Sequence, residues 1–182
     1  IRISDLELAA AAGRLAMGSG TFRLGMLGAE DADHLTASAD LKLEAKDLEA
    51  PGGLPLGPSV GRIALTARVM GGIGRGTGAL AAWRDKGGTV EVGDLALDYG
   101  PLEARASGTV ALDGAMQPVG AFTARIRGFF KTVDELRARG LIRARDAVTA
   151  KVVLGVMARQ QGGGGAPTLN LAVTVQDRKV YV

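Results

Sequence analysis

Apolar and polar residues alternate with a period of two along most of the chain. In the longest run, apolar or small side chains occupy the even positions from Leu102 to Leu112, and polar ones the odd positions from Glu103 to Thr109. Successive side chains of a β-strand point to opposite faces, so these runs indicate strands with one apolar and one polar face. Shorter runs of the same kind occur near residues 1–8, 21–26, 41–46, 62–69, 90–99, 122–127, 169–176 and 179–182.

Short turn signals connect several of these runs. Gly100-Pro101 and Asp113-Gly114 each separate two alternating stretches, and Asp177-Arg178 does the same near the end of the sequence. Strands joined by tight turns pair antiparallel, and several in succession form a meander. The 28 glycines also favour strands and turns, because a glycine inside a helix costs about 1 kcal/mol relative to alanine.

We therefore predict a mainly β (α+β) fold: a long curved antiparallel sheet with two or three short helices packed at one side or end. The helical pattern of apolar residues places these helices at residues 77–86, 131–139 and 143–161. Residues 51–58 are rich in Pro and Gly and are predicted to be the main loop or linker. Both ends of the sequence lie inside alternating runs, so we expect a fragment of a longer chain.

The residues that usually carry catalysis or bind metals are sparse. The chain has no cysteine and one histidine, His34, in a polar stretch where a surface position is the simplest interpretation. Asp31 and Asp33 lack the spacing and closing glutamate of a calcium loop, so a solvated acidic loop is expected. We expect no catalytic residues, no metal site and no cofactor, and therefore a protein that is not an enzyme.

A glycine-rich segment, residues 71–78, follows a predicted strand and precedes a predicted helix. It has neither the Gly-Lys-Ser/Thr ending of a phosphate-binding loop nor the spacing of a dinucleotide fingerprint. A flexible connection is the favoured interpretation. A weak anion site at the start of the helix is the alternative.

Seven arginines and lysines lie between residues 125 and 145, with Phe129 and Phe130 among them. Such a segment can be an ordinary solvated surface, a contact for lipid headgroups or a site for single-stranded nucleic acid. It has no RNP aromatic pattern and no helix-turn-helix, so we expect no nucleic acid partner. For headgroup contact the candidates are Arg125, Arg127 and Lys131.

The predicted strands share one continuous apolar face, and the helices are too few and too short to cover it. Large exposed apolar patches are rare in monomeric proteins. We expect a second layer, a protein partner or an acyl chain to cover this face. Small residues such as Ala104, Ala106 and Ala124 leave room for a ligand, but they also suit a plain core or close packing by the helix at 143–161. The candidate groove lining is Leu95, Leu97, Leu102, Ala104, Val110, Leu112, Phe122 and Ile126.

One block of sequence is more specific than composition. It runs from Leu80 through Trp83, Gly87-Gly88 and Gly100-Pro101 to Gly120, and a second such stretch closes the sequence from Val175 to Val182, with Arg178 where a glycine is expected. From about Ile63 to Val182 the chain resembles a proteobacterial family called domain of unknown function 2125, which is similar to the C-terminal region of AsmA-like envelope proteins. The resemblance implies a bent antiparallel sheet related to lipid carriers, in a periplasmic body whose inner-membrane anchor lies outside this sequence.

The resemblance and the apolar face together suggest a division and a function. Residues 1–58 would supply N-terminal strands and a linker, and residues 59–182 the AsmA-like C-terminal region, in one continuous domain. The leading hypothesis is a non-catalytic envelope module that handles lipid or maintains the envelope through a hydrophobic groove. One alternative is a structural or assembly module whose apolar face docks on an unknown protein partner. An enzyme acting on lipids or glycans is the weaker alternative, and it would need paired carboxylates in a cleft.

Overall fold

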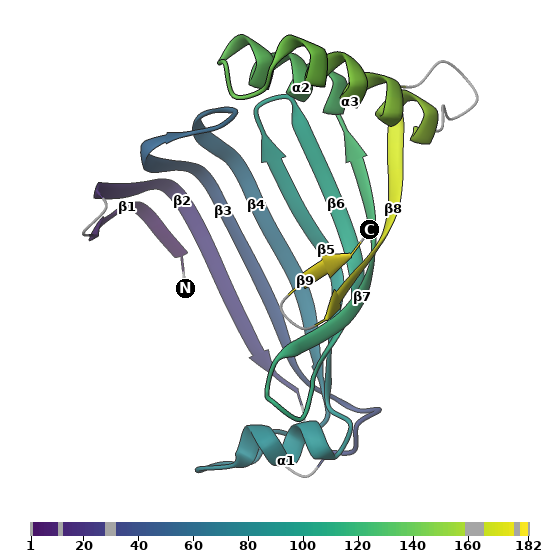
Figure 1. Ribbon diagram of the computed structural model, residues 1–182. Helices are drawn as coiled ribbons and strands as arrows, with labels where there is room; N and C mark the ends of the chain where they lie inside the picture. The colour runs from purple at the N-terminus through teal and green to yellow at the C-terminus, as the bar shows by residue number, and fades with distance from the viewer. Residues whose placement is uncertain (1, 11–12, 28–31, 159–165, 177–178, 182) are drawn as a thin grey trace.

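The computed structural model describes residues 2–10, 13–27, 32–158, 166–176 and 179–181. It contains one nine-stranded sheet and three helices (Figure 1). The strands are β1 (Arg2–Ala10), β2 (Gly13–Met26), β3 (Ala37–Leu54), β4 (Gly57–Met70), β5 (Thr89–Tyr99), β6 (Leu102–Leu112), β7 (Pro118–Arg127), β8 (Thr168–Gln176) and β9 (Lys179–Tyr181). The helices are α1 (Ala79–Asp85), α2 (Phe129–Ala138) and α3 (Ala144–Met157).

Every strand pairs with the strand that follows it in the sequence. The order across the sheet is β1 to β9 without a crossover, and every pair is antiparallel. The predicted meander is confirmed, as is the length of β6, which covers all of residues 102–112. The predicted turn at Asp177-Arg178 lies outside the described residues.

The helices occupy the two ends of the sheet (Figure 1). Helix α1 connects β4 to β5 at one end, and α2 with α3 connects β7 to β8 at the other. Packing of the third helix on the small residues of the sheet, one of the alternatives raised by the sequence, is wrong. Within the described residues α3 packs mainly against α2, and Ala147 is its one buried residue.

The predicted loop at residues 51–58 is a tight hairpin. Strand β3 continues to Leu54 and β4 begins at Gly57, which leaves only Pro55 and Leu56 in the turn. The register of the two strands shifts between Glu49 and Leu54. Such an irregularity lets a strand accept prolines and glycines that a regular ladder would not. The buried Leu56 donates its backbone N–H to the Tyr99 hydroxyl at 2.6 Å, which ties the turn to β5.

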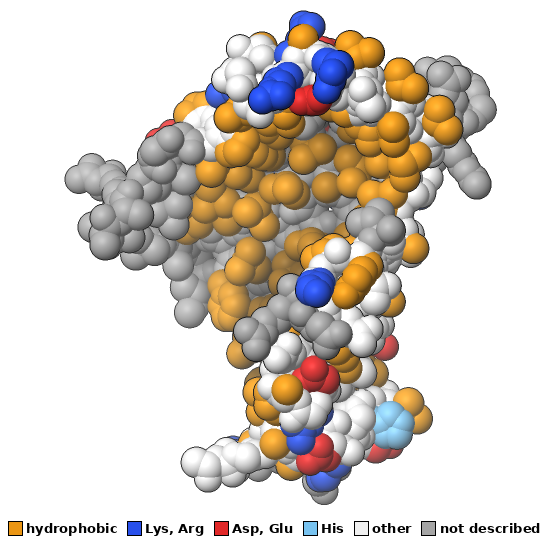
Figure 2. Space-filling view, in the orientation of Figure 1, with side chains coloured by type: hydrophobic (Ala, Val, Ile, Leu, Met, Phe, Trp, Pro, Cys, Tyr) orange, Lys and Arg blue, Asp and Glu red, His pale blue; other side chains and the backbone are white. Residues whose placement is uncertain are grey.

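The sheet curves, and its two faces differ in chemistry. Figure 2 looks into the hollow of the sheet, where hydrophobic side chains gather. The opposite, convex face carries the polar positions of the same strands. Its ion pairs join neighbouring strands: Arg62 with Glu44 at 2.9 Å, Arg68 with Asp40 at 3.0 Å and Arg105 with Asp98 at 3.5 Å. Exposed ion pairs of this kind each contribute little to the free energy of folding. Their charged groups make the convex face hydrophilic.

The indole of Trp83 organises the α1 end of the sheet. Trp83 is 4% exposed, and its ring N–H donates to the carbonyl of Met70 at 2.8 Å, which fixes α1 against the end of β4. Gly88 passes directly over this ring: a Cβ built on Gly88 would lie 2.2 Å from Trp83 Cε2. Only glycine permits that approach.

Substitution of Gly88 by alanine therefore tests the packing of Trp83. Gly88→Ala should reduce the free energy of unfolding by about 1–3 kcal/mol, because either the indole or the backbone must move. Urea denaturation followed by circular dichroism measures the loss. The control is Gly25→Ala, where a new Cβ meets nothing within 4 Å. Equal stability of the two variants would contradict the close approach.

The pair of Glu44 and Arg62 predicts an effect of pH. Because Arg62 Nε donates a hydrogen bond to Glu44 and Lys46 lies nearby, the pKa of the Glu44 carboxyl is below its ordinary value. A lowered folded-state pKa gives stability that is complete above the unfolded value of about 4.3 and is lost as the pH falls through the folded value. Unfolding in urea at about pH 6 and pH 3 should show a smaller loss on acidification in Glu44→Gln than in the wild type. Glu49→Gln removes one carboxyl at an exposed position of the same strand and serves as the control for the loss of one charge.

Candidate functional site: the concave apolar wall

Cross-strand rows of apolar side chains build the hollow of the sheet. The strand register puts residues of seven strands, β2 to β8, opposite one another in four such rows. We call this surface the apolar wall. Its two central rows are Phe22, Leu43, Leu65, Leu95, Ala106, Ala124 and Leu171, and Ala45, Ile63, Leu97, Ala104, Ile126 and Leu169. Its other two rows are Leu24, Leu41, Ala67, Val92, Gly108, Phe122 and Val173, and Met26, Ala39, Val69, Val90, Val110, Gly120 and Val175.

All eight groove residues predicted from the sequence lie on this one face of β5, β6 and β7. Leu97, Ala104 and Ile126 are direct neighbours across three strands, and Phe122 is opposite Gly108. Leu95 and Val110 belong to neighbouring rows, while Leu102 and Leu112 occupy the two ends of β6. The structure therefore places the eight side chains on one face, spread over the whole length of β6, and their role in binding stays a prediction.

The apolar wall is only partly shielded from water. None of the eight predicted residues is buried, and Leu95, near the middle of the sheet, is 39% exposed. Along β2 the exposed fraction rises from 36% at Phe22 to 74% at Met26. Ala104, Ala106 and Ala124 are half-buried, so they do not belong to a filled core.

The candidate lining residues named from the sequence were limited to β5, β6 and β7, whereas the apolar wall also extends over β2, β3 and β4. The signal was present, because Phe22, Leu43 and Leu65 belong to alternating runs and differ from Leu95 only in lying on earlier strands. The register of strands so far apart in the sequence could not be assigned from alternation alone. The candidate site is thus wider than predicted.

Small residues give the apolar wall depth. Ala45, Ala104, Ala106 and Ala124 occupy its central rows, where larger side chains would fill the hollow. Gly108 lies under the ring of Phe122: a Cβ there would be 2.7 Å from Phe122 Cδ1. An aromatic ring over a cross-strand glycine is a common way to fix a sheet register.

The α2 end of the apolar wall is closed by aromatic packing. Phe129 and Val133 of α2 are buried, and Leu169 at the start of β8 is 4% exposed. The rings of Phe129 and Phe130 are tilted against each other, with centroids 4.5 Å apart. The wall therefore has a well-packed end at α2 and a more exposed side at β2.

The three predicted headgroup residues do not form one cluster. Arg125 and Arg127 belong to the convex face, because they alternate with Ala124 and Ile126 of the wall. Arg125 Nε donates to Asn170 at 3.4 Å on that face. Arg127 and Lys131 line a pocket of about 480 Å³ at the β7–α2 junction, together with Glu103 and Phe130. Headgroup contact by these residues stays a prediction.

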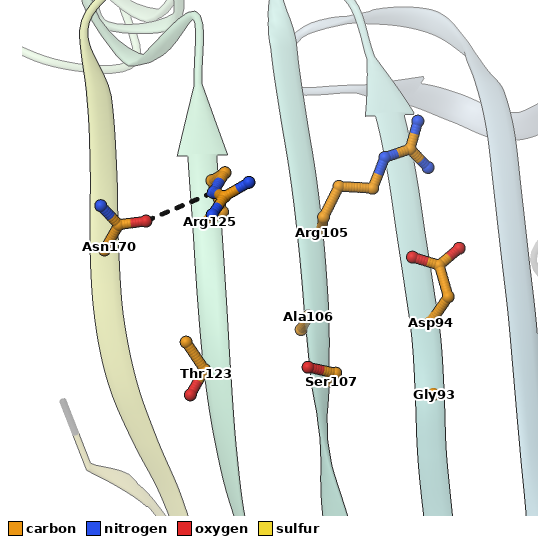
Figure 3. Close-up of a pocket in the computed structure, with 8 residues that line it drawn as sticks. All are labelled: Gly93, Asp94, Arg105, Ala106, Ser107, Thr123, Arg125 and Asn170. Atoms are coloured by element: carbon orange, nitrogen blue, oxygen red, sulfur yellow. Dashed lines mark hydrogen bonds between the residues drawn. The ribbon is translucent and has the colours of Figure 1, made fainter. Parts of the chain in front are cut away.

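The convex face holds a shallow polar pocket of about 210 Å³ (Figure 3). Asp94, Arg105, Arg125 and Asn170 surround it from four neighbouring strands. The carboxylates that an enzyme hypothesis would use, Asp94, Asp98 and Glu103, all project from this water-facing side, and Asp98 is paired with Arg105. The positions of these three carboxylates therefore give no support to a catalytic site.

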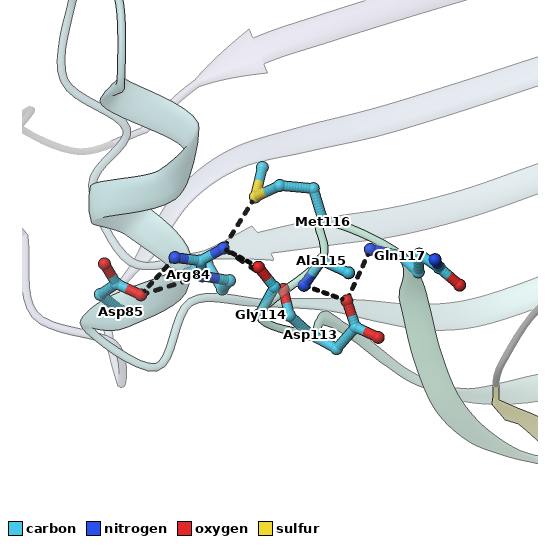
Figure 4. Close-up of polar contacts among 7 residues, drawn as sticks. All are labelled: Arg84, Asp85, Asp113, Gly114, Ala115, Met116 and Gln117. Atoms are coloured by element: carbon cyan, nitrogen blue, oxygen red, sulfur yellow. Dashed lines mark hydrogen bonds and ion pairs between the residues drawn. The ribbon is translucent and has the colours of Figure 1, made fainter.

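Polar residues at the α1 end have structural partners. Arg84 donates to the carbonyls of Asp113 and Gly114 and pairs with Asp85 at 2.7 Å, which links α1 to the β6–β7 turn (Figure 4). In that turn the Asp113 carboxylate accepts the backbone N–H groups of Ala115 and Gln117. These hydrogen bonds fix the turn, and they already pair the side chains of Arg84 and Asp113 within the protein.

The remaining sequence candidates lie close to this end. His34 is exposed, as predicted. The Asp33 carboxylate accepts hydrogen bonds from the Thr36 hydroxyl and the Leu35 N–H, and its pKa is lowered mainly by Thr36. Asp31 lies outside the described residues, among which no group of three metal-binding side chains occurs.

The glycine-rich segment is held at its start. Gly71 and Gly72 are buried, and their N–H groups donate to the carbonyls of Thr36 and Ala32. Helix α1, which follows, has seven residues and no side-chain cap. The start of the segment is therefore held by backbone hydrogen bonds, and no contact in the described residues supports the anion-site alternative.

Fold and site together define a class: an open antiparallel sheet with one charged face in water and one apolar face left uncovered by the described elements. The chain belongs to a bacterial family described as "Uncharacterized protein conserved in bacteria (DUF2125)", whose model matches residues 1–182. No curated protein and no solved structure matches it. The described helices all fall short of the length and hydrophobicity needed to cross a bilayer.

A matched pair of substitutions tests whether the apolar wall is open. Leu169→Ala removes a buried side chain and should cost about 2–5 kcal/mol of unfolding free energy. Leu95→Ala, on the same face but 39% exposed, should cost about 1 kcal/mol or less, because little buried area is lost. Urea unfolding of both variants measures the difference. Similar large losses in both would show that the wall is a filled core in solution.

Proposed function

We propose that this protein handles lipid in the bacterial envelope by binding acyl chains along the apolar wall. The observation that carries the proposal is the half-exposed wall itself, continuous across seven strands and uncovered by any described element. An apolar surface of this extent rarely faces water in a monomer. Burial of an acyl chain contributes about 0.8 kcal/mol per CH₂ group, so a chain of ordinary length could bind to a wall of this kind.

The dimensions and chemistry of the apolar wall fit this occupant. Eleven residues of β6 at about 3.3 Å each give a length of roughly 35 Å, more than an acyl chain needs to span half of a bilayer core of about 30 Å. The central rows contain only carbon side chains, which suits a ligand without polar groups along its length. Ala104, Ala106 and Ala124 provide the space.

The resemblance to AsmA-like envelope proteins supports the same proposal. It would place the domain in the periplasm, next to an inner-membrane anchor outside this sequence. Docking of the apolar wall on a protein partner, or on another part of a longer chain, is the competing explanation. Polar groups for specific protein contacts are absent from the described central rows of the wall, which favours lipid.

A charge placed on the apolar wall tests the proposal. Ala124→Asp should weaken binding of a fluorescent phospholipid at least about tenfold, because a carboxylate beside an acyl chain must lose its hydration. Ala121→Asp, three residues away on the convex face of the same strand, adds the same charge and should change binding less than about twofold. Circular dichroism melts confirm that both variants fold.

Two outcomes would count against lipid binding. If native mass spectrometry of protein purified without detergent finds no bound lipid, and the protein does not take up the fluorescent probe, the acyl-chain proposal fails. If a longer version of the chain covers the apolar wall and abolishes uptake that the domain shows alone, the structural alternative is the better explanation.

A further inference from the structure

Positive charge is concentrated at the α2–α3 end of the molecule. Residues 125–157 contain eight arginines and lysines against three acidic residues, a formal charge of +5, whereas the whole chain carries +3. The rest of the chain is therefore slightly acidic. Two of the three acidic groups are paired locally, Asp134 with Lys151 at 2.6 Å and Glu135 with Arg139 at 3.7 Å. Arg137, Arg143 and Arg145 are exposed there, and basic side chains surround α2 and α3 in Figure 2.

The second half of α3 is apolar and exposed. Residues 152–157 contain no charged or polar side chain, and within α3 only Ala147 is buried. Val152 is 61% exposed and Val156 83% exposed, on the same stripe of the helix as Val148 at 62%. A helix that is apolar on all sides is normally buried in protein or in lipid. Some other surface should therefore cover this half of α3.

We propose that the α2–α3 end docks on an anionic lipid bilayer, with the second half of α3 inserted at the boundary between headgroups and acyl chains. Clusters of arginine and lysine are attracted to anionic lipid surfaces, and apolar side chains beside them supply the buried area that holds an element at the interface. An anionic bilayer therefore accounts for both the basic charge and the exposed apolar half of α3.

A second copy of the chain fits less well. A symmetric contact through Val148, Val152 and Val156 would bring the two +5 segments together. Like charges held close at an interface oppose association. An acidic bilayer has the opposite charge and accepts the valines, so charge complementarity favours lipid.

Docking in this way would position the apolar wall. Helices α2 and α3 lie over one end of the hollow in Figures 1 and 2, so a bilayer in contact with α3 would lie near that end. The inference goes beyond acyl-chain binding and does not depend on it, because a surface can dock without any lipid leaving the bilayer.

The absence of cysteine from the sequence allows a direct test. Val156→Cys, labelled with a fluorophore that brightens in apolar surroundings, should increase in emission at least about twofold with vesicles of phosphatidylcholine and phosphatidylglycerol. The same label on Leu35→Cys should not respond. Leu35 is 75% exposed, and its neighbour His34 lines a pocket with Trp83 of α1, which lies at the opposite end of the sheet from α2 and α3. Vesicles of phosphatidylcholine alone should give a much smaller increase.

Charge reversal separates the electrostatic part of docking. In the labelled Val156→Cys protein, the pair Arg143→Glu and Arg145→Glu should lower vesicle affinity at least about tenfold, since each basic residue near the surface contributes about 1 kcal/mol. Lys42→Glu with Lys86→Glu makes the same net change at exposed positions away from α2 and α3, and should lower affinity much less. Raising the salt to about 1 M should also weaken docking, because the screening length falls to about 3 Å.

The outcomes separate this inference from the proposed function. Ala124→Asp should weaken phospholipid binding at least about tenfold and leave the response at Val156 unchanged. Loss of both would overturn docking as an independent property. No response at Val156, or an equal response to neutral vesicles, would overturn it as well. So would a response without vesicles that grows with protein concentration, because that would identify a second copy as the cover of α3.

Discussion

One-sided burial is the constraint on which the structure depends. Strands β2 to β8 send alternate side chains to a charged face and to an apolar face, and their pairing in sequence order extends both faces across the sheet. The three helices of the described residues contribute too little area to cover the apolar side, and they pack at the ends of the sheet. The protein is therefore left with a broad, half-exposed hydrocarbon surface. The proposed lipid function follows from this shortage of covering elements, and no special residue is needed for it.

The two proposals use different parts of the molecule and different forces. The apolar wall relies on removal of hydrocarbon from water, which does not depend on attraction between opposite charges. The α2–α3 end combines arginines with valines, so its attraction to a bilayer depends on ionic strength. A lipid carrier needs both properties: a surface that holds acyl chains and a way of meeting the membrane that supplies or accepts them.

Much of this could be predicted from the sequence, because a period of two reports the face of every residue. The meander and the common face of Leu97, Ala104 and Ile126 followed directly. The same alternation also places Arg125 and Arg127 on the opposite face from the apolar wall. In β7 the wall residues have even numbers, and these two arginines have odd numbers. The alternation did not predict the hairpin at residues 51–58. There the register of β3 and β4 shifts, and this irregularity accommodates the Gly and Pro residues that suggested a loop.

The position of α3 was beyond the reach of pattern. Helical periodicity predicted a helix at residues 143–161, and its packing on the small residues of the sheet was one of the alternatives left open. Helix α2, however, follows β7 directly in the sequence. Because of this connection α2, with its buried Phe129 and Val133, lies next to the sheet. Helix α3 packs on α2 and presents its valines outward. Sequence gives the face of a helix, but the order of packing is set by the connections.

The strictly sequential pairing of strands has a consequence for how such a molecule assembles and varies. Every strand pairs with its neighbour in the sequence, so the sheet can grow strand by strand, although β8 can pair with β7 only after the long connection through α2 and α3 has closed. Each β-hairpin is then a self-contained addition to the edge. Duplication or loss of a hairpin would change the width of the hollow while leaving the neighbouring strands in register, which offers evolution a simple means of adjusting capacity.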